Sequence, residues 1–260
     1  MNLPDEDVAS GAANVHFEWN GKSKDVKPAA ANKAADNVYK VSCSVAAAEM
    51  TDTITATYGG YSKEYTVKGY ADKILADETK YAKEQTLIKT MLNYGAYAQI
   101  EFNHNTGNLA NAGIDYALTN LSDDELQALS AYPVPDKTAM DNELAGSGLT
   151  YHSMTLLLQD KVTLRYYYQI QDENYNRAII TGKDSGGVYV YYDYANIYPS
   201  MLDENTYFLN AAKQKTEGVS PLAYVNHVLT TSNDTDLRNV VTALYRYHKA
   251  AQEYEQPGNS

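Results

Sequence analysis

The chain has 260 residues, a formal net charge of −12 and a single cysteine, Cys43. An acidic chain without clustered Lys and Arg is a poor match for nucleic acid or an anionic membrane surface, so neither is expected as a partner. No apolar run approaches the roughly 20 residues of a transmembrane helix, so membrane insertion is not expected. One cysteine cannot form an intrachain disulfide, and the acidic charge favours a monomer.

The acidic N-terminus carries no apolar stretch of the kind found in a signal peptide, and we expect the chain to be a segment of a larger protein. Residues 15–19 alternate apolar and polar side chains, which is the period of a strand with one buried face. Asn20-Gly21 predicts a hairpin turn after this strand. Further strands are expected at residues 38–43 and 53–58, and Gly59-Gly60 predicts a turn into residues 61–67.

Helical spacing begins near residue 68. A short helix is expected at residues 68–76 and a longer one at residues 84–102. Helical spacing places one set of residues on a single face of the longer helix, namely Ile88, Met91, Leu92, Gly95, Ala98 and Phe102. The small Gly95 and Ala98 allow a neighbouring element to approach closely. In the connector that follows, Ser122 and Glu125 have the spacing of a capping box, which predicts a short helix ending near Ser130.

The second part of the chain returns to strand alternation at residues 154–158, 164–170 and 188–194, and Gly186-Gly187 marks a turn before the last of these. Ser220-Pro221 predicts a helix start, with Ser220 as the N-cap and Pro221 at the first helical position. A long helix is expected from about Thr235.

The two helical regions, residues 70–102 and 224–254, are a sequence repeat. Identical residues recur at matching positions, namely Tyr70, Leu75, Tyr94, Ala98 and Gln99 in the first and Tyr224, Leu229, Tyr247, Ala251 and Gln252 in the second. We therefore predict an α+β fold of two tandem related modules, each an antiparallel β-sheet or sandwich followed by a helix pair. The predicted ranges are 1–105 for the first module, 106–147 for a connector with the short capped helix, and 148–260 for the second module.

Tyrosine is unusually frequent, with 25 Tyr against three Phe and one Trp. Alternation in the second part predicts that Arg165 and Tyr167 on one strand, and Tyr189 and Tyr191 on another, point away from the core. If the two strands pair, these four residues share one exposed sheet face. Tyr with Arg is the composition of protein-binding hot spots, and Tyr rings also stack on sugars. The competing interpretation is that a second sheet or the connector covers this face and makes it core.

Catalytic and metal-binding patterns are missing from the sequence. The five histidines lie in unrelated contexts without zinc-site spacing, and neither a nucleophile elbow nor a phosphate-binding loop occurs. Neighbouring carboxylates are frequent, but no pattern makes two of them converge across a cleft. We therefore expect no enzyme, no metal site and no cofactor. A repeated module without a repeated catalytic motif is typical of binding or spacer arrays.

Three strings carry a resemblance to a known kind of protein: residues 44–56, residues 65–75 and residues 88–99. Together they resemble a repeat module of large secreted or wall-anchored surface proteins of anaerobic gut Clostridia, and residues 148–252 resemble the partner half of that module. The resemblance implies an extracellular, non-catalytic module on a bacterial surface. Proteins of this general kind include immunoglobulin-binding, B-cell-superantigen-type proteins, but the resemblance transfers no binding residue to this chain.

The leading hypothesis is therefore a cell-surface binding module for a host protein, with immunoglobulin Fab as the first specific candidate. Two alternatives stay open at this point. The chain could be a carbohydrate-binding module that takes a glycan, or a ligand-free spacer within a surface stalk. The candidate binding residues are Arg165, Tyr167, Tyr189 and Tyr191.

Overall fold

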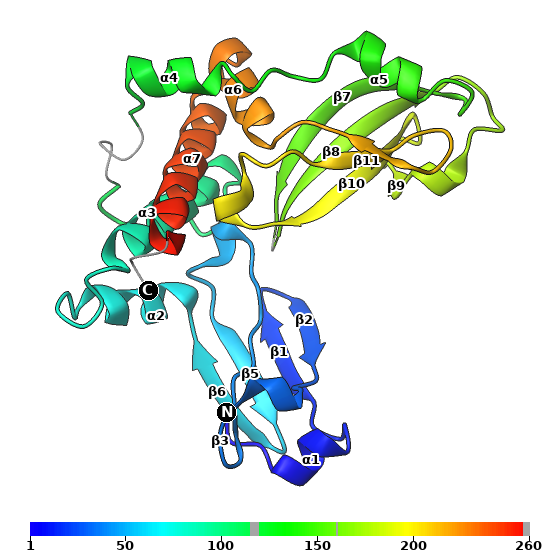
Figure 1. The fold of residues 1–260 in the computed structure, drawn as a ribbon. Helices are drawn as coiled ribbons and strands as arrows, with labels where there is room; N and C mark the ends of the chain where they lie inside the picture. The colour runs from blue at the N-terminus through cyan, green and yellow to red at the C-terminus, as the bar shows by residue number, and fades with distance from the viewer. Residues whose placement is uncertain (115–119, 160, 257–260) are drawn as a thin grey trace.

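A computed structural model describes residues 1–114, 120–159 and 161–256 of the chain (Figure 1). Parts of the predicted connector (residues 115–119) and of the predicted second module (residues 160 and 257–260) lie outside the described residues. The fold is α+β, as predicted: helices combine with sheets in which every described strand pair is antiparallel. The tandem arrangement of two modules is not confirmed and stays a prediction.

The N-terminal part is a four-stranded sheet with the order β2-β1-β5-β6. Its strands are β1 (Val15–Trp19), β2 (Lys22–Val26), β5 (Ile54–Tyr58) and β6 (Tyr61–Tyr65). Asn20 and Gly21 both have positive φ, 44° and 70°, which is the backbone of the tight hairpin turn that an Asn-Gly pair favours. The predicted strands at residues 15–19 and 53–58 are thus confirmed to within one residue.

Short elements flank this sheet, namely α1 (Asp5–Ala9), the 3-10 turns η1 (Ala30–Asn32) and η2 (Ala47–Glu49), β3 (Lys33–Ala35) and β4 (Val38–Tyr39). They enclose a small core that includes Leu3, Val15, Phe17 and Ile54. The strand predicted at residues 38–43 was too long, because regular pairing ends after Tyr39. Only two residues of β4 face β3, and the chain then leaves towards η2.

Besides α1, the structure has the helices α2 (Val67–Leu75), α3 (Gln85–Glu101), α4 (Asp123–Leu129), α5 (Lys137–Glu143), α6 (Leu222–Thr231) and α7 (Thr235–Glu255). The capping box at α4 is confirmed, because the Ser122 side chain accepts from the Glu125 N–H and the Glu125 carboxylate accepts from the Ser122 N–H. Helix α6 begins one residue later than predicted. Ser220 Oγ still accepts a hydrogen bond from the Leu222 N–H.

A second four-stranded sheet has the order β7-β8-β10-β9. Its strands are β7 (Leu149–Leu158), β8 (Val162–Ile170), β9 (Gly182–Lys183) and β10 (Tyr189–Ile197), with the 3-10 turns η4 (Arg177–Ile179) and η5 (Pro199–Met201) beside them. A small hairpin of β11 (Tyr207–Leu209) and β12 (Lys215–Glu217) packs on the inner face of this sheet. There the Tyr166 hydroxyl lies 2.6 Å from Thr206 Oγ1, and the Phe208 ring lies 5.6 Å from the Tyr166 ring.

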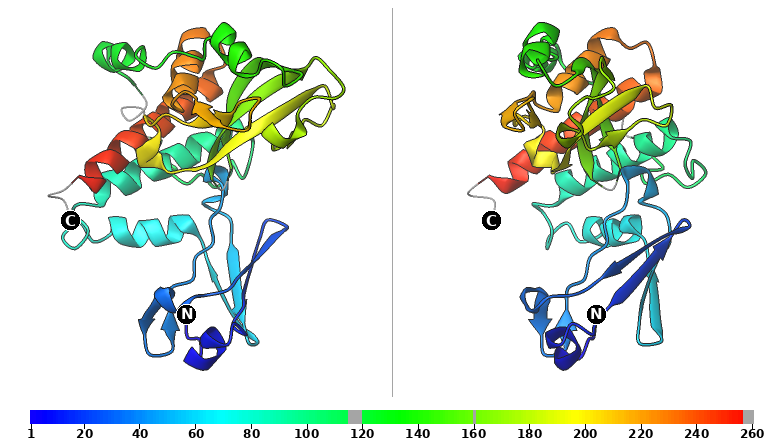
Figure 2. Two further views of the ribbon diagram at one scale, coloured as in Figure 1. Left: turned by 45° about the vertical axis from the view of Figure 1, so that its right-hand side comes forward. Right: turned by 90° about the vertical axis from the view of Figure 1, so that its right-hand side faces the viewer.

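The long helices α3 and α7 pack against each other and run in opposite directions (Figure 2). They belong to one large hydrophobic core that also contains the inner face of the second sheet, including Leu164, Tyr166 and Val190. Helix α3 was predicted to lie in the first module, yet its core contacts are shared with the second sheet. The large core thus draws residues from all three predicted ranges, and the boundaries at residues 105 and 147 stay a prediction.

Candidate functional site

Strand pairing places the four predicted binding residues together. Arg165 and Tyr167 lie on β8, and Tyr189 and Tyr191 lie on β10. In the antiparallel register Tyr191 is opposite Tyr167, and Asp193 is opposite Arg165. Because side chains alternate along a strand, these residues share the face opposite the fully buried Tyr166, Tyr168 and Val190. We call the face formed by Arg165, Tyr167, Tyr189 and Tyr191 the tyrosine face.

The rings of the tyrosine face pack in edge contacts. Tyr167 meets Tyr189 at a centroid distance of 6.5 Å and Tyr191 at 6.0 Å, with ring planes 76° and 74° apart. Edge-to-face pairs of this kind each contribute about 0.5–1.5 kcal/mol beyond area burial. Contact with neighbouring rings holds each Tyr in one orientation, so the face loses little side-chain entropy when a partner binds.

His152 is a member of this site that sequence reasoning missed. Its ring stacks on Tyr189, with a centroid distance of 4.3 Å and an angle of 16° between the planes. The register of β7 shifts between Tyr151 and Ser153, so strict alternation does not place His152 correctly. A β-bulge inserts one residue and redirects a side chain. Nothing in the sequence marks this bulge.

Asp193 lies on the same face but was not among the four predicted binding residues. It accepts hydrogen bonds from Arg165 Nε at 2.7 Å and Nη2 at 2.8 Å, which makes a two-pronged ion pair. The guanidinium carbon also lies 3.4 Å from the centre of the Tyr191 ring. The hydrogen bonds to Asp193 raise the pKa of Arg165 above its usual value. The ion pair with Asp193 thus fixes the Arg165 guanidinium over the Tyr191 ring and balances its positive charge.

The competing interpretation was that a second sheet or the connector covers the tyrosine face and makes it core, and the exposure of its residues bears on this. All four predicted residues are half-buried, and they contact one another. Tyr191 also lies close over Gly182 of β9, where a Cβ atom would be 2.6 Å from its hydroxyl oxygen. The β11–β12 hairpin lies on the other face, where the Tyr207 ring is 6.3 Å from Tyr192 and 4.9 Å from Tyr194.

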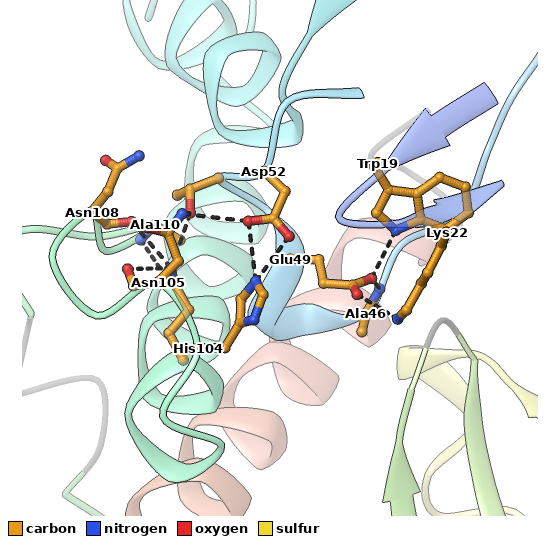
Figure 3. A network of polar contacts seen from close by, with 11 residues as sticks. Trp19, Lys22, Ala46, Glu49, Asp52, His104, Asn105, Asn108 and Ala110 are labelled. Carbon is orange, nitrogen blue, oxygen red and sulfur yellow. Dashed lines mark hydrogen bonds and ion pairs between the residues drawn. The ribbon is translucent and has the colours of Figure 1, made fainter. Parts of the chain in front are cut away.

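A network of polar contacts lies near η2, between the N-terminal sheet and the large core (Figure 3). The buried Glu49 carboxylate accepts from Trp19 Nε1 and from the Ala46 N–H, both at 3.0 Å, and forms an ion pair with Lys22. Burial acts against its ionised form, but the bonds from Lys22, Trp19 and Ala46 outweigh burial and hold the pKa of Glu49 below its usual value. This network satisfies a buried charge and joins η2 to the β1–β2 hairpin.

Next to it, the Gln99 side chain donates to Thr51 Oγ1 at 3.0 Å and accepts from the Ala110 N–H at 2.7 Å. His104 Nε2 lies 2.8 Å from an Asp52 carboxylate oxygen. These contacts fasten the loop after α3 to the segment after η2. In the described ranges, no three His, Cys, Asp or Glu side chains are grouped so that they could hold a metal ion.

No family model, no curated protein and no solved structure matches the chain. Within the described residues, no helix has both the length and the apolar character needed to cross a membrane.

Proposed function

We propose that the chain is a non-catalytic binding module of a bacterial cell-surface protein, exposed outside the cell as a segment of a larger protein. Its partner is a host protein, with immunoglobulin Fab as the first candidate. The location and the partner rest on the resemblance of residues 44–56, 65–75 and 88–99 to modules of such proteins. The binding residues are those of the tyrosine face.

The observation that carries the proposal is the packing of two Tyr rings, Tyr189 and Tyr191, against Tyr167, with Arg165 held beside them by Asp193. Rigid Tyr side chains offer a large amphipathic contact area at low entropic cost. Such residues dominate the binding energy of protein interfaces when they lie at the centre of a dry patch. The Tyr hydroxyls add hydrogen-bonding groups at the rim of each ring.

The geometry favours a protein over a sugar. A sugar stacks on an open ring face, but His152 covers one face of Tyr189 and Arg165 covers one face of Tyr191. Ring edges and hydroxyls suit a mixed protein surface better than they suit a pyranose ring. A glycan partner and a ligand-free spacer are therefore outcomes of the test and are not proposed.

The test is biolayer interferometry of the isolated chain against polyclonal Fab fragments. We expect sub-micromolar binding to a fraction of the Fab pool. Tyr167→Ser and Tyr189→Ser should each weaken binding by about 30-fold, the equivalent of a hot spot of about 2 kcal/mol. Tyr61→Ser is the matched control, because Tyr61 is 83% exposed and lies on β6 in the other sheet.

Thermal unfolding of the same variants separates binding from folding. Binding lost with an unchanged melting temperature supports the tyrosine face as the interface. A collapse of the melting temperature in Tyr167→Ser would mean that the residue is core. Absence of Fab binding at high concentration removes Fab as the partner, and a glycan array then decides between a sugar-binding module and a spacer.

A further inference from the structure

Strand β7 is an edge strand, and only the first half of its outer edge is covered by another element. It is the outermost strand of its sheet. At Tyr151, helix α5 covers the edge, because the Asp141 carboxylate accepts from the Tyr151 N–H at 2.7 Å and Lys137 Nζ donates to the Tyr151 carbonyl at 2.8 Å. Among the described residues, the backbone at residues 154–158 has no hydrogen-bond partner beyond β8. Proteins usually shield such edges, so the open stretch needs an explanation.

The open stretch lines a cleft of about 1020 Å³. The facing wall is the β1–β2 hairpin, with Trp19 and residues 22–24, and β2 is itself the outermost strand of the N-terminal sheet. Figure 1 shows the end of β7 pointing towards this hairpin. The cleft therefore lies between two edge strands, and the backbone of β7 at residues 154–158 is available to a segment that enters it.

The floor of the cleft is apolar and reachable. Phe102, directly after α3, is 52% exposed and lines the cleft together with the half-buried Leu157, Tyr224 and Leu237. An exposed apolar patch flanked by polar groups is typical of an interaction site. This floor would therefore favour apolar side chains at the positions of an incoming strand that point towards it.

The charge of the cleft is uneven. On the wall formed by the β1–β2 hairpin, Lys22 forms an ion pair with Glu49 and Lys24 is a second cation. Glu101 lies close enough to Asp234 and Asp236 for their charges to act on its carboxyl group. Burial, followed by the charges of these two Asp residues, raises the pKa of the Glu101 carboxyl. The end of the cleft near Glu101 thus concentrates negative charge and attracts a basic group.

We propose that this cleft binds an extended peptide segment of a partner protein, which adds to β7 as a further strand at residues 154–158. Unpaired backbone groups on a strand edge recognise an extended chain through main-chain hydrogen bonds, and pockets along the edge select alternate side chains. The peptide carries apolar residues at every second position and a Lys or Arg at the end beside Glu101. This site adjoins the tyrosine face, since Thr155 of the cleft lies opposite Arg165. It uses the backbone edge of β7 and the cleft side chains, which are not members of the tyrosine face, and it does not depend on the proposed function.

The experiment uses Trp19, the chain's only tryptophan, as a reporter on the cleft wall. The probes are octapeptides of alternating Thr and an apolar residue (Val, Leu, Ile or Tyr), each with Arg at either end, titrated against the whole chain. We expect a saturable change in Trp19 fluorescence. Peptides N-methylated at alternate residues, so that the donors facing β7 are removed, should lose at least tenfold in affinity.

Variants locate the site. Leu157→Lys and Phe102→Ala should each weaken peptide binding at least tenfold, whereas Val188→Lys, at a 58% exposed position outside the cleft, should not. Phe102 is half exposed, so its variant tests the site even if Leu157→Lys disturbs folding. Glu101→Gln should remove the preference for an Arg-bearing end, and Tyr167→Ser should leave peptide binding unchanged.

The proposal is overturned if no peptide of the series changes Trp19 fluorescence, or if N-methylated peptides bind as well as the parents. Sedimentation of the unliganded chain provides a further check. A dimer that Leu157→Lys abolishes would show that a second copy of the chain, and not a foreign peptide, pairs with the β7 edge.

Discussion

The rings of Tyr94 and Tyr247 stack at a centroid distance of 6.1 Å with their planes 26° apart. These two residues occupy the same position in the sequence repeat, Tyr94 on α3 and Tyr247 on α7. A contact between equivalent residues of two antiparallel helices is what an approximate two-fold axis between the helices would produce. Each helix also packs on a 3-10 turn, α3 on η2 and α7 on η5. The repeated sequence thus builds a self-complementary helix pair.

A double-mutant cycle on this pair should reveal coupling. Tyr94→Ala should cost about 3–5 kcal/mol of unfolding free energy, because Tyr94 is only 4% exposed. Tyr247→Ala should cost less, since Tyr247 is half-buried. The double variant should lose about 0.5–1.5 kcal/mol less than the sum of the two. Urea unfolding measures all three values. The control is Tyr254→Ala, because Tyr254 lies near the end of α7 and is 39% exposed. Strict additivity would show that the ring contact contributes nothing of its own.

Two neighbouring tyrosines on the inner sheet face should respond to the same change with opposite sign. Tyr166 bonds with Thr206 Oγ1 at 2.6 Å and accepts from the Val219 N–H at 3.0 Å. The buried Tyr168 hydroxyl has no hydrogen-bond partner in the part of the chain that the structure describes. Tyr166→Phe should therefore destabilise by about 1–3 kcal/mol, because it leaves the Val219 N–H unpaired. Tyr168→Phe should leave stability unchanged or raise it by about 1 kcal/mol. Equal losses in denaturant unfolding would contradict the assigned contacts.

Gly95→Ala should destabilise the protein although alanine is the better helix former. A Cβ atom at Gly95 would lie 2.7 Å from Met50 Sδ and 3.2 Å from both the Ala47 carbonyl oxygen and Ala110 Cβ. The gain in helix propensity is about 1 kcal/mol, whereas overpacking costs about 1–3 kcal/mol. We expect a net loss in chemical unfolding. Gly113→Ala, where a Cβ atom meets nothing within 4 Å, is the control. A stabilised Gly95→Ala variant would mean that η2 does not press on α3.

Acid should weaken the contact between α7 and η5 through His248. This residue is 1% exposed, and its Nδ1 lies 2.7 Å from the Pro199 carbonyl oxygen. Burial lowers its pKa below the usual value of 6.5, despite the opposing influence of Pro199 and Asp203. The unfolded chain therefore binds the proton more readily than the native one. The contribution to stability is complete above pH 6.5 and declines as the pH falls below that value.

The measurement for His248 is the unfolding free energy of the protein and of His248→Gln between pH 7.5 and pH 5. The protein should lose stability over this interval more steeply than the variant. Other groups also titrate in this pH range, among them His16, whose pKa is raised by its hydrogen bonds with Asp25 and Glu18. The difference between the two profiles removes their contribution. Parallel profiles would show that His248 is not the group that titrates.

Local patterns predicted the elements well, because capping and alternation act over a few residues. The Ser122–Glu125 capping box and the start of α7 at Thr235 are where the sequence placed them. Alternation also put Tyr167 and Tyr191 on one sheet face. His152 was missed because a register shift in β7 redirects it, and the Arg165–Asp193 pair was missed because it depends on the register between two strands.

The sequence patterns did not predict which elements pack against each other over long distances in the chain. Helix α3 was predicted to have one apolar face, yet residues 92–99 are all buried, because α7, η2 and the following loop surround the helix. Phe102, predicted on that apolar face, is instead half exposed. The repeat revealed two equivalent helices but not that they would pack against each other.

The internal pairing of Arg165 with Asp193 has a consequence for how the tyrosine face would meet a partner. A cation that is already neutralised by its own neighbour contributes little long-range field. The Arg165–Asp193 pair would then add little of its own to the electrostatic steering of a partner, and would not make the association rate more sensitive to ionic strength. The selectivity of the tyrosine face would lie in how long a complex survives and not in how quickly it forms.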